Sequence, residues 1–320
     1  MAGLIKKFLV STSIAAGMTA LTGIPALAQI ENPTVQGGEY KIYEAVDTDG
    51  DGIVDATKEN SSADIVEVLK KVDGTPGGNI ELFSDSEDSK YNTKIVEDTV
   101  CTLDFGFGCI IEAKTKTYDV TNFANANVTS ISGMLGGKEL TLSSLTAKDW
   151  FGDNLDTSYG ADNLANTWFD QFLNAAGQNQ LGLTNKQDAF YSFLGMNGFQ
   201  RTSDANISYV DLVGKGDLKI GLAGHFDLKE FYSESPEFAS IVALLPDGFQ
   251  ASEVVKYEYD GAIDYAFGFT ATESGLVALD DGKSHTGNYE VSVPEPSSVL
   301  ALMAVGGILL ASKKKSQKNG

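Results

Sequence analysis

The residues best suited to chemistry are four aspartates in one short acidic run. Asp47, Asp49, Asp51 and Asp55 occupy positions 1, 3, 5 and 9 of the run that begins at Asp47, and Gly52 occupies position 6. Carboxylates at this spacing, with a glycine that permits a tight turn, begin a calcium-binding loop. We therefore expect calcium as a ligand here. A metal-free acidic turn is the open alternative, because short motifs of this kind have frequent false positives.

The twelfth position distinguishes this run from a complete EF-hand loop. A bidentate glutamate is required there, but Lys58 occupies the position. The spacing also resembles that of a thrombospondin type 3 repeat, which lacks this glutamate. The missing acid predicts weak calcium affinity, on the order of 10⁻⁴–10⁻³ M as in extracellular modules.

The chain has two cysteines, Cys101 and Cys109, separated by seven residues. In an oxidising compartment such a pair is expected to form a disulfide that closes a short loop. Two separate buried thiols are the alternative. Zinc is not expected, because a zinc site needs about four ligands and the two histidines, His225 and His285, lie far away in the sequence.

No arrangement of residues predicts catalysis, and we expect a protein that is not an enzyme. The G-x-S-x-G pattern of a serine hydrolase does not occur. His225 and His285 lie in glycine-rich turns near acids, where a structural hydrogen bond is the favoured interpretation. Arg201, the one arginine, lies near Asp204 and is expected to form a structural salt bridge or to clamp backbone carbonyls rather than to bind an anion. A secreted hydrolase is the open alternative, and a cleft with two carboxylates or a His–Asp pair would support it.

Two aromatic pairs could stack on sugar rings. They are Trp150 with Phe151 and Trp168 with Phe169. Aromatic residues at helical and strand positions more often belong to the core, so we expect core positions. A calcium- or carbohydrate-binding module nevertheless stays open as an alternative function.

The elements that must position these residues are mostly strands. Alternation of apolar and polar residues predicts strands around 40–46, 79–83, 207–213 and 218–223, and again through the final third. The period changes in the middle of the chain, where residues 163–178 have helical spacing. A Thr184–Gln187 capping box predicts the start of a further helix, and residues 62–71 predict a short helix nearer the N-terminus. We expect an α+β fold, a mainly antiparallel β-sheet with a central helical insertion.

Composition and charge restrict the partners. The 320 residues are long enough to bury a core. Residues 29–296 contain 17 basic and 44 acidic side chains, a net charge of −27. Such a surface repels phosphates, so nucleic acid is not expected as a partner, whereas divalent cations are attracted.

The N-terminal residues 1–28 predict a secretory signal peptide. Lys6 and Lys7 precede an apolar stretch, and a small-x-small site ends at Ala28. Signal peptidase of the Sec export machinery would leave an exported mature domain, residues 29–293, of which 29–60 are predicted to be acidic and loop-rich.

The C-terminal residues 294–320 predict a membrane-sorting tail. Pro294, Glu295 and Pro296 precede an apolar run at about 299–311, and a lysine cluster follows. As a helix this run spans only about 20 Å, less than the ~30 Å hydrocarbon core. A short transmembrane helix with cytoplasmic lysines is therefore expected to anchor the protein before processing.

This tail resembles a PEP-CTERM sorting segment, on the residues just named and on the glycine pair at 306–307. The resemblance implies sorting by an exosortase-like membrane protease, and a link to exopolysaccharide in Gram-negative bacteria. Residues 75–293 also resemble a cyanobacterial family of such proteins, whose function is uncharacterised. The segments that carry this second resemblance are 136–146, 149–152, 198–201, 206–210, 221–225, 251–256, 282–285 and 287–291. We therefore expect an exported envelope or matrix protein, finally at the cell surface or outside it, and associated with extracellular polysaccharide.

Overall fold

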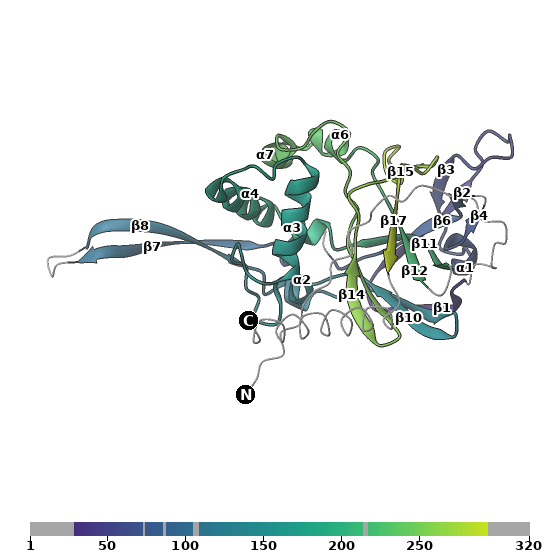
Figure 1. Cartoon of the computed structure of the whole chain (residues 1–320), viewed down its shortest axis with the longest axis horizontal. Coiled ribbons are helices and arrows are strands. Elements are labelled where there is room, and N and C mark those ends of the chain that lie inside the picture. The colour runs from purple at the N-terminus through teal and green to yellow at the C-terminus, as the bar shows by residue number, and fades with distance from the viewer. Residues whose placement is uncertain (1–28, 73, 86–87, 105–108, 214–216, 294–320) are drawn as a thin grey trace, which may run out of the picture.

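The computed structural model describes residues 29–293, except 73, 86–87, 105–108 and 214–216, and gives no side-chain placement for residues 100–113. Two β-sheets form the body (Figure 1). The smaller has the strand order β1 (Glu31–Gln36), β9 (Ser130–Leu135), β10 (Lys138–Ser143), β13 (Val255–Tyr259), β14 (Ala262–Ala266). The larger has the order β15 (Thr272–Glu273), β17 (Gly287–Val293), β12 (Asp217–Gly224), β11 (Ala205–Val213), β6 (Gly78–Leu82), β2 (Tyr40–Val46), β3 (Ala56–Glu59), β16 (Val277–Ala278).

The pairing in the described residues is antiparallel, except that β16 pairs with β3 in parallel. The hairpin between β9 and β10 turns on Gly136 and Gly137, whose φ angles are 60° and 80°. A two-residue hairpin loop of this kind needs two positive φ angles, which glycine adopts without strain. The expected mainly antiparallel, sheet-rich α+β class is therefore confirmed.

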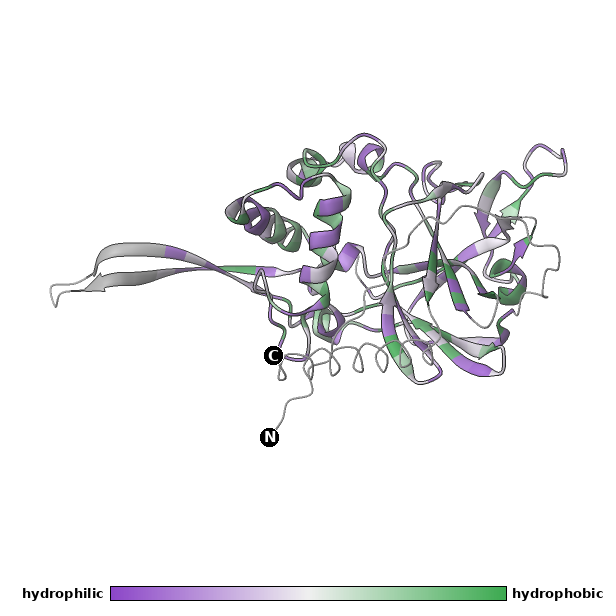
Figure 2. Cartoon of the chain, in the orientation of Figure 1, coloured by the Kyte–Doolittle hydropathy of each residue, from purple (hydrophilic) through white to green (hydrophobic). Residues whose placement is uncertain are grey.

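The two sheets bury one hydrophobic core between them. β11 has seven consecutive buried residues, as expected of a strand covered on both faces. Residues of both sheets meet in this core, among them Ile80, Leu82, Ile207, Ile220, Leu140 and Leu142. Figure 2 shows hydrophobic and hydrophilic residues alternating along many of these strands, as the two-residue period of a strand requires.

A helical lobe follows β10 and returns the chain to β11. Its helices are α2 (Ala147–Phe151), α3 (Leu164–Ala175), α4 (Leu183–Gly195) and α5 (Gly198–Arg201). The lobe has its own aromatic core, in which Trp150, Phe151, Trp168 and Phe169 are all buried. The expectation of core positions for the two aromatic pairs is therefore confirmed.

Smaller elements complete the body. They are α1 (Ile65–Val68), β4 (Lys71–Val72), β5 (Thr75–Pro76), η1 (Ser89–Tyr91), η2 (Phe123–Asn125), α6 (Leu228–Ser233), η3 (Pro236–Phe238) and α7 (Ala239–Val242). Strands β7 (Lys94–Asp104) and β8 (Cys109–Asp119) pair with each other alone and project from the body as an arm (Figure 1).

Three local expectations differ from the structure. The segment 29–60 contains three strands rather than one, because β1 joins the edge of the small sheet and β3 pairs with β2. Helix α1 has only four residues, capped by Asp64, and the chain then enters β4. The N-cap of α4 is Gly182, so Thr184 lies inside the helix and the predicted capping box is wrong.

The predictions for the two chain ends concern residues that the structure does not describe. The predicted signal peptide at 1–28 and the short transmembrane helix at 299–311 both lie outside the described residues. Within the part of the chain that is described, no helix combines the length and the apolar character needed to cross a bilayer.

The aromatic core of the lobe generates a stability prediction. Phe199 is 1% exposed, and its ring lies 4.9–6.2 Å from those of Trp150, Phe151, Trp168, Phe190 and Phe193. Phe199→Ala should lower the free energy of unfolding by about 3–5 kcal/mol, because it leaves a cavity among rigid rings. Denaturant unfolding curves measure this loss. The control is Leu183→Ala at a 74%-exposed position, where a change within about 0.5 kcal/mol is expected; equal effects of the two variants would contradict the prediction.

Candidate functional site

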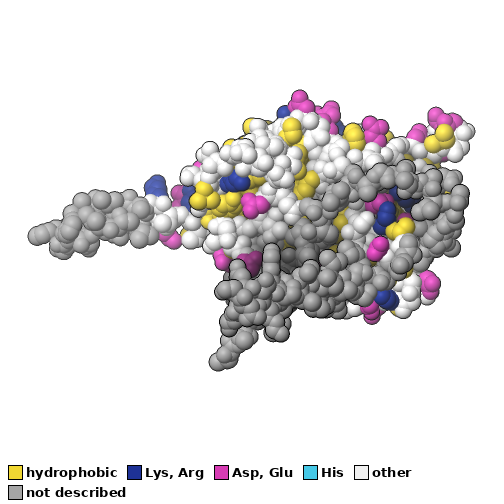
Figure 3. All heavy atoms as spheres, viewed as in Figure 1, with side chains coloured by type: hydrophobic (Ala, Val, Ile, Leu, Met, Phe, Trp, Pro, Cys, Tyr) yellow, Lys and Arg dark blue, Asp and Glu magenta, His cyan; other side chains and the backbone are white. Residues whose placement is uncertain are grey.

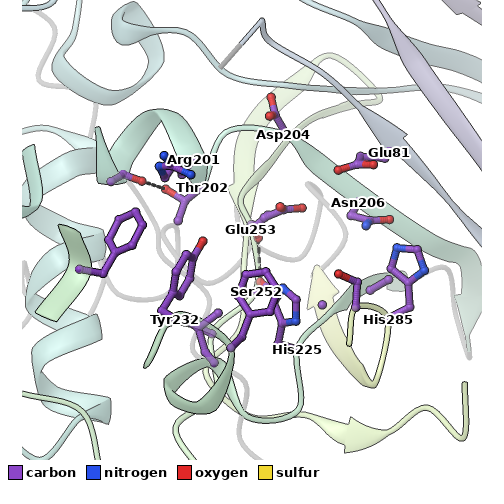
Figure 4. A pocket seen from close by; sticks show the side chains of 18 of the residues that line it. Glu81, Arg201, Thr202, Asp204, Asn206, His225, Tyr232, Ser252, Glu253 and His285 are labelled. Atoms are coloured by element: carbon purple, nitrogen blue, oxygen red, sulfur yellow. Dashed lines mark hydrogen bonds between the residues drawn. The ribbon is translucent and has the colours of Figure 1, made fainter. Parts of the chain in front are cut away.

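One cavity brings together both histidines and the one arginine of the chain. It has a volume of about 340 Å³ and lies where the helical lobe, helices α6 and α7 and the large sheet meet. This volume is within the range of roughly 300–1,000 Å³ that small-molecule sites occupy. In Figure 4 the labelled side chains surround the cavity, with Arg201 and Tyr232 at one side and Glu81, Asn206 and His285 at the other.

The sheet wall of the cavity is built on a buried chain of polar side chains. Asn79 on β6 donates from Nδ2 to Oδ1 of Asn206 on β11 over 2.6 Å, and the same nitrogen lies 3.2 Å from Nε2 of His285. The other ring nitrogen of His285, Nδ1, lies 2.7 Å from Oγ1 of Thr57 on β3. Two strands of the large sheet, β6 and β3, therefore hold His285 by both nitrogens, although more than two hundred residues separate it from Asn79 in sequence.

This arrangement assigns the protonation state of His285. Since the Asn79 amide nitrogen is a donor, Nε2 must accept, and the proton of the neutral ring is on Nδ1, facing Thr57. Burial of the ring lowers the pKa of His285 to about 4, although Asp280 and Asp281 oppose the shift. Protonation would place an N–H against the Asn79 amide, so the ring is neutral at ordinary pH.

The wall contributed by the helical lobe comes from the segment between α5 and β11. Asp204 is 5% exposed, and its Oδ1 accepts hydrogen bonds from the backbone N–H and the hydroxyl of Ser84, at 2.7 and 2.9 Å. Arg201 ends α5, and its guanidinium carbon lies 4.9 Å from the ring centre of Phe238. Folding of the lobe onto the sheet therefore places an arginine and a buried aspartate on one wall.

The third wall is aromatic. His225 follows β12 and stacks on Phe231 of α6, with ring centres 3.7 Å apart. Phe231, Tyr232 and Phe238 line the cavity together with Trp168 of α3. Burial lowers the pKa of His225 to about 4, although a hydrogen bond to the Lys283 backbone and the charge of Asp281 oppose the shift. The second histidine is therefore also neutral.

Three buried nitrogen atoms of residues that line this cavity have no hydrogen-bond partner among the described residues. They are Nε1 of Trp168, Nε of Arg201 and Nδ1 of His225. Folded proteins satisfy about 90% or more of their buried polar groups, and each exception costs about 1–3 kcal/mol. Two donors and one acceptor in one cavity are therefore the pattern of a site that a polar ligand or ordered water completes.

The cavity also has the features named above for a hydrolase. Five acidic side chains line it, together with two basic ones and the two neutral histidines. Carboxylates and a neutral imidazole in one cavity can serve as general acid and base. The same groups can bind a polyhydroxylated molecule without reacting with it.

Sequence reasoning identified several of these residues but not their association. The structural hydrogen bonding expected of His285 is confirmed, and Arg201 and Asp204 do lie on one wall. The association was missed because the lining residues extend from Lys41 to His285. The one arginine and the two histidines were the available signal, since residue types that occur so rarely in the chain are all found here.

The acidic run forms a separate, exposed loop beyond β2. Asp47, Asp49 and Asp51 bring carboxylate oxygens within 4.8 Å of one another. Asp47 accepts the backbone N–H groups of Gly50 and Gly52, at 2.6 and 2.7 Å, and these bonds lower its pKa.

The fourth predicted ligand, Asp55, has a different role in the same loop. Its two oxygens accept the N–H and the hydroxyl of Thr48, at 3.0 and 2.6 Å, which closes the base of the loop. The structure therefore gathers three of the four predicted carboxylates, and calcium stays a prediction.

The two cysteines lie on the arm. Cys101 is opposite Glu112 and Cys109 is opposite Asp104, so the register does not make them cross-strand partners. Their side chains are outside the described part of the structure, and the disulfide stays a prediction. Pro294, Glu295 and Pro296 also lie outside the described residues.

Comparison with known proteins identifies the C-terminal tail. The family described as the PEP-CTERM protein-sorting motif matches residues 292–315. No curated protein and no solved structure matches the chain. The motif indicates an exported protein that an exosortase-like membrane protein processes, as expected from the tail. The resemblance of residues 75–293 to a cyanobacterial family stays a prediction.

The two neutral histidines predict an acid-sensitive domain. Their folded-state pKa values of about 4 lie below the unfolded value of 6.5. The stability that the neutral histidines contribute is therefore complete above pH 6.5 and is lost as the pH falls toward 4. The free energy of unfolding should fall by up to about 1.4 kcal/mol per pH unit for each histidine in this window.

Urea unfolding between about pH 7.5 and 5 measures the slope. His225→Gln and His285→Gln should each remove about half of the part of this slope that comes from the histidines. Asp211 and Asp264, whose pKa values are raised by burial, act in the opposite direction but are present in every variant. A slope that neither substitution changes would contradict the assignment.

Proposed function

We propose that this chain is an exported cell-envelope or extracellular-matrix protein whose domain binds a saccharide unit of the surrounding polysaccharide. The sorting motif at residues 292–315 marks the chain as exported and exosortase-sorted. Delivery through the Sec machinery and signal peptidase, and a final place at the surface or outside the cell, are parts of the proposal. Binding without reaction is the proposed role of the domain.

The observation that carries the proposal is that Trp168, Arg201 and His225, whose atoms Nε1, Nε and Nδ1 have no partner among the described residues, all line one cavity. A sugar presents hydroxyl groups that both donate and accept, so it can pair with donors and with acceptors. The rings of Phe231 and Tyr232 offer apolar faces for the C–H surface of the sugar. Aromatic faces combined with a few polar groups are typical of small-molecule sites.

A secreted hydrolase is the second candidate. The presence of Glu81, Asp204 and Glu253 around one cavity with His225 favours it. Hydrolysis of a glycosidic bond uses a pair of carboxylates, so the same ligand class would serve as substrate. Product formation distinguishes the two functions.

Calcium binding by the acidic loop is a separate proposal. Asp47, Asp49 and Asp51 already gather their oxygens, and calcium accepts 6–8 oxygen ligands. The mutual repulsion of exposed carboxylates in a domain of high negative charge would be relieved by a divalent cation. Such a site would join the protein to anionic surroundings.

For the sorting assignment, we predict that Pro294→Ala with Pro296→Ala prevents C-terminal processing in the producing cells. The double variant should accumulate with its tail in the membrane fraction, while the thermal unfolding of the domain is unchanged, because both positions lie outside the folded sheets. Cell fractionation and mass spectrometry of the C-terminus give the readout. Pro246→Ala, the same change at an exposed position of the domain, is the control; normal surface delivery of the double variant would refute the role of the motif.

For the cavity, we predict that the domain binds oligosaccharides prepared from the extracellular polysaccharide. Trp168→Phe removes the indole N–H and leaves a smaller aromatic ring, and should weaken binding about three- to ten-fold, as the loss of one hydrogen bond predicts. The matched control is Trp150→Phe, because Trp150 donates to Ser203 in the core and does not line the cavity. Isothermal titration gives the affinities, and chromatography of the incubated sugars detects cleavage. Release of shorter fragments would show that the domain hydrolyses the sugars, and would contradict binding without reaction.

For the acidic loop, we predict a calcium dissociation constant on the order of 10⁻⁴–10⁻³ M, with poor competition by Mg²⁺. Asp49→Ala with Asp51→Ala should abolish this binding. A double variant of two exposed aspartates elsewhere, Asp153→Ala with Asp162→Ala, has the same net charge and should bind as the wild type does. If the two double variants bind calcium alike, calcium binding depends only on the net charge of the domain and not on the loop.

A further inference from the structure

We infer that the cavity selects a saccharide that carries a protonated amino group, an amino sugar rather than a neutral or acidic one. The inference rests on the proposed saccharide-binding function and names the class of sugar. Its observations are the charges around the cavity and the buried donor Nε1–H of Trp168, which is 1% exposed and has no partner in the described part of the chain.

The formal charge of the cavity wall is negative. Lys41 and Arg201 contribute two positive charges, and the five carboxylates contribute five negative ones, leaving −3. These carboxylates belong to Glu81, Asp204, Glu253, Asp280 and Asp281. The two histidines do not change the balance, because their pKa values of about 4 leave them neutral.

Charges elsewhere on the domain strengthen the negative electrostatic potential of the cavity rather than cancel it. Residues 29–296 have a net charge of −27, and Figure 3 shows acidic side chains distributed over the visible face. A cavity with low-dielectric aromatic walls focuses such a field. A uronate or a sulfated sugar would therefore be repelled, and an ammonium group would be attracted.

Hydrogen-bonding groups at the cavity define the rest of the ligand. The indole N–H of Trp168 and the Nε–H of Arg201 can donate to hydroxyl or ring oxygens, and Nδ1 of the neutral His225 can accept from a hydroxyl. A polyamine offers no oxygen to the two donors. A sugar ring with one ammonium group matches both the charge and the hydrogen-bonding pattern.

Arg201 does not by itself make the cavity an anion site. Its guanidinium packs on the ring of Phe238, and Asp204 and Glu253 line the same cavity. A carboxylate ligand beside Arg201 would also be near these two acids. The arginine is therefore assigned to a neutral oxygen of the sugar.

The test compares four sugars of similar size at about pH 7 and constant ionic strength: glucosamine, glucose, N-acetylglucosamine and glucuronate. Isothermal titration with the exported domain should show glucosamine binding at least about ten-fold more tightly than glucose or N-acetylglucosamine, with glucuronate weakest, as expected for an ion pair in a partly desolvated site. Added salt should reduce the preference for the amine.

Variants connect the preference to the cavity. Glu81→Gln and Glu253→Gln, which keep the side-chain shape, should each lower the preference for glucosamine over glucose several-fold and leave glucose binding nearly unchanged. Glu97→Gln on the arm changes the net charge equally but lies outside the cavity, and should have no effect.

The outcomes separate the two proposals. If no sugar binds, including the oligosaccharides of the polysaccharide, the saccharide-binding function itself is wrong. If sugars bind without preference for the amine, or if Glu97→Gln changes the preference as much as the cavity variants do, only the present inference is overturned. Spermidine that binds as tightly as glucosamine would also overturn it, since charge alone would then explain the binding.

Discussion

The structure depends on how six residues, 199–204, attach the helical lobe to the sheets. At one end the Phe199 ring is at the centre of the aromatic core of the lobe. At the other end Asp204 holds the end of β6 through Ser84. Between them, backbone hydrogen bonds join Ser203 to Leu145 and Thr202 to Val254. Because so few residues carry these contacts, the position of the lobe and the shape of the cavity are set together.

The cavity lies at the seam between two cores of different character. The core between the sheets consists mainly of aliphatic residues and tyrosines, and the hydrogen bonds through Asn79 and His285 form the sheet wall of the cavity. The core of the lobe is mainly aromatic. Polar groups at the seam cannot all find hydrogen-bond partners within the protein. Each of the two cores is closely packed, so its side chains cannot shift to meet those of the other core. Unsatisfied atoms therefore gather where the two cores meet, and this is also where a ligand can provide the missing bonds.

Acidic residues have different physical roles in different parts of this chain. In the loop beyond β2, exposed carboxylates accept backbone N–H groups of their own turn, so their charges are solvated and locally satisfied. Around the cavity, acids lie beside aromatic rings and neutral histidines, where the lower dielectric strengthens their field. The proposals made for the two places, a small hard cation in the loop and an amino sugar in the cavity, follow from this difference in surroundings.

The pattern of neighbouring residues in the sequence was sufficient to predict the sorting tail, the fold class and several helices and strands. The matched motif at 292–315 is a continuous stretch, and the helical spacing that predicts α3 depends on neighbouring residues alone. The start of α4 was wrong because the capping box at Thr184 competed with a start at Gly182, and nothing local decides between them. Strand β1 was missed because its partner β9 lies far along the chain, and β3, although it pairs with the preceding β2, has only four residues and no apolar alternation. The candidate cavity could not be predicted at all. It requires Tyr43, Arg201 and His285 to come together, and only the pairing of distant strands and the packing of the lobe against them bring these residues to one place.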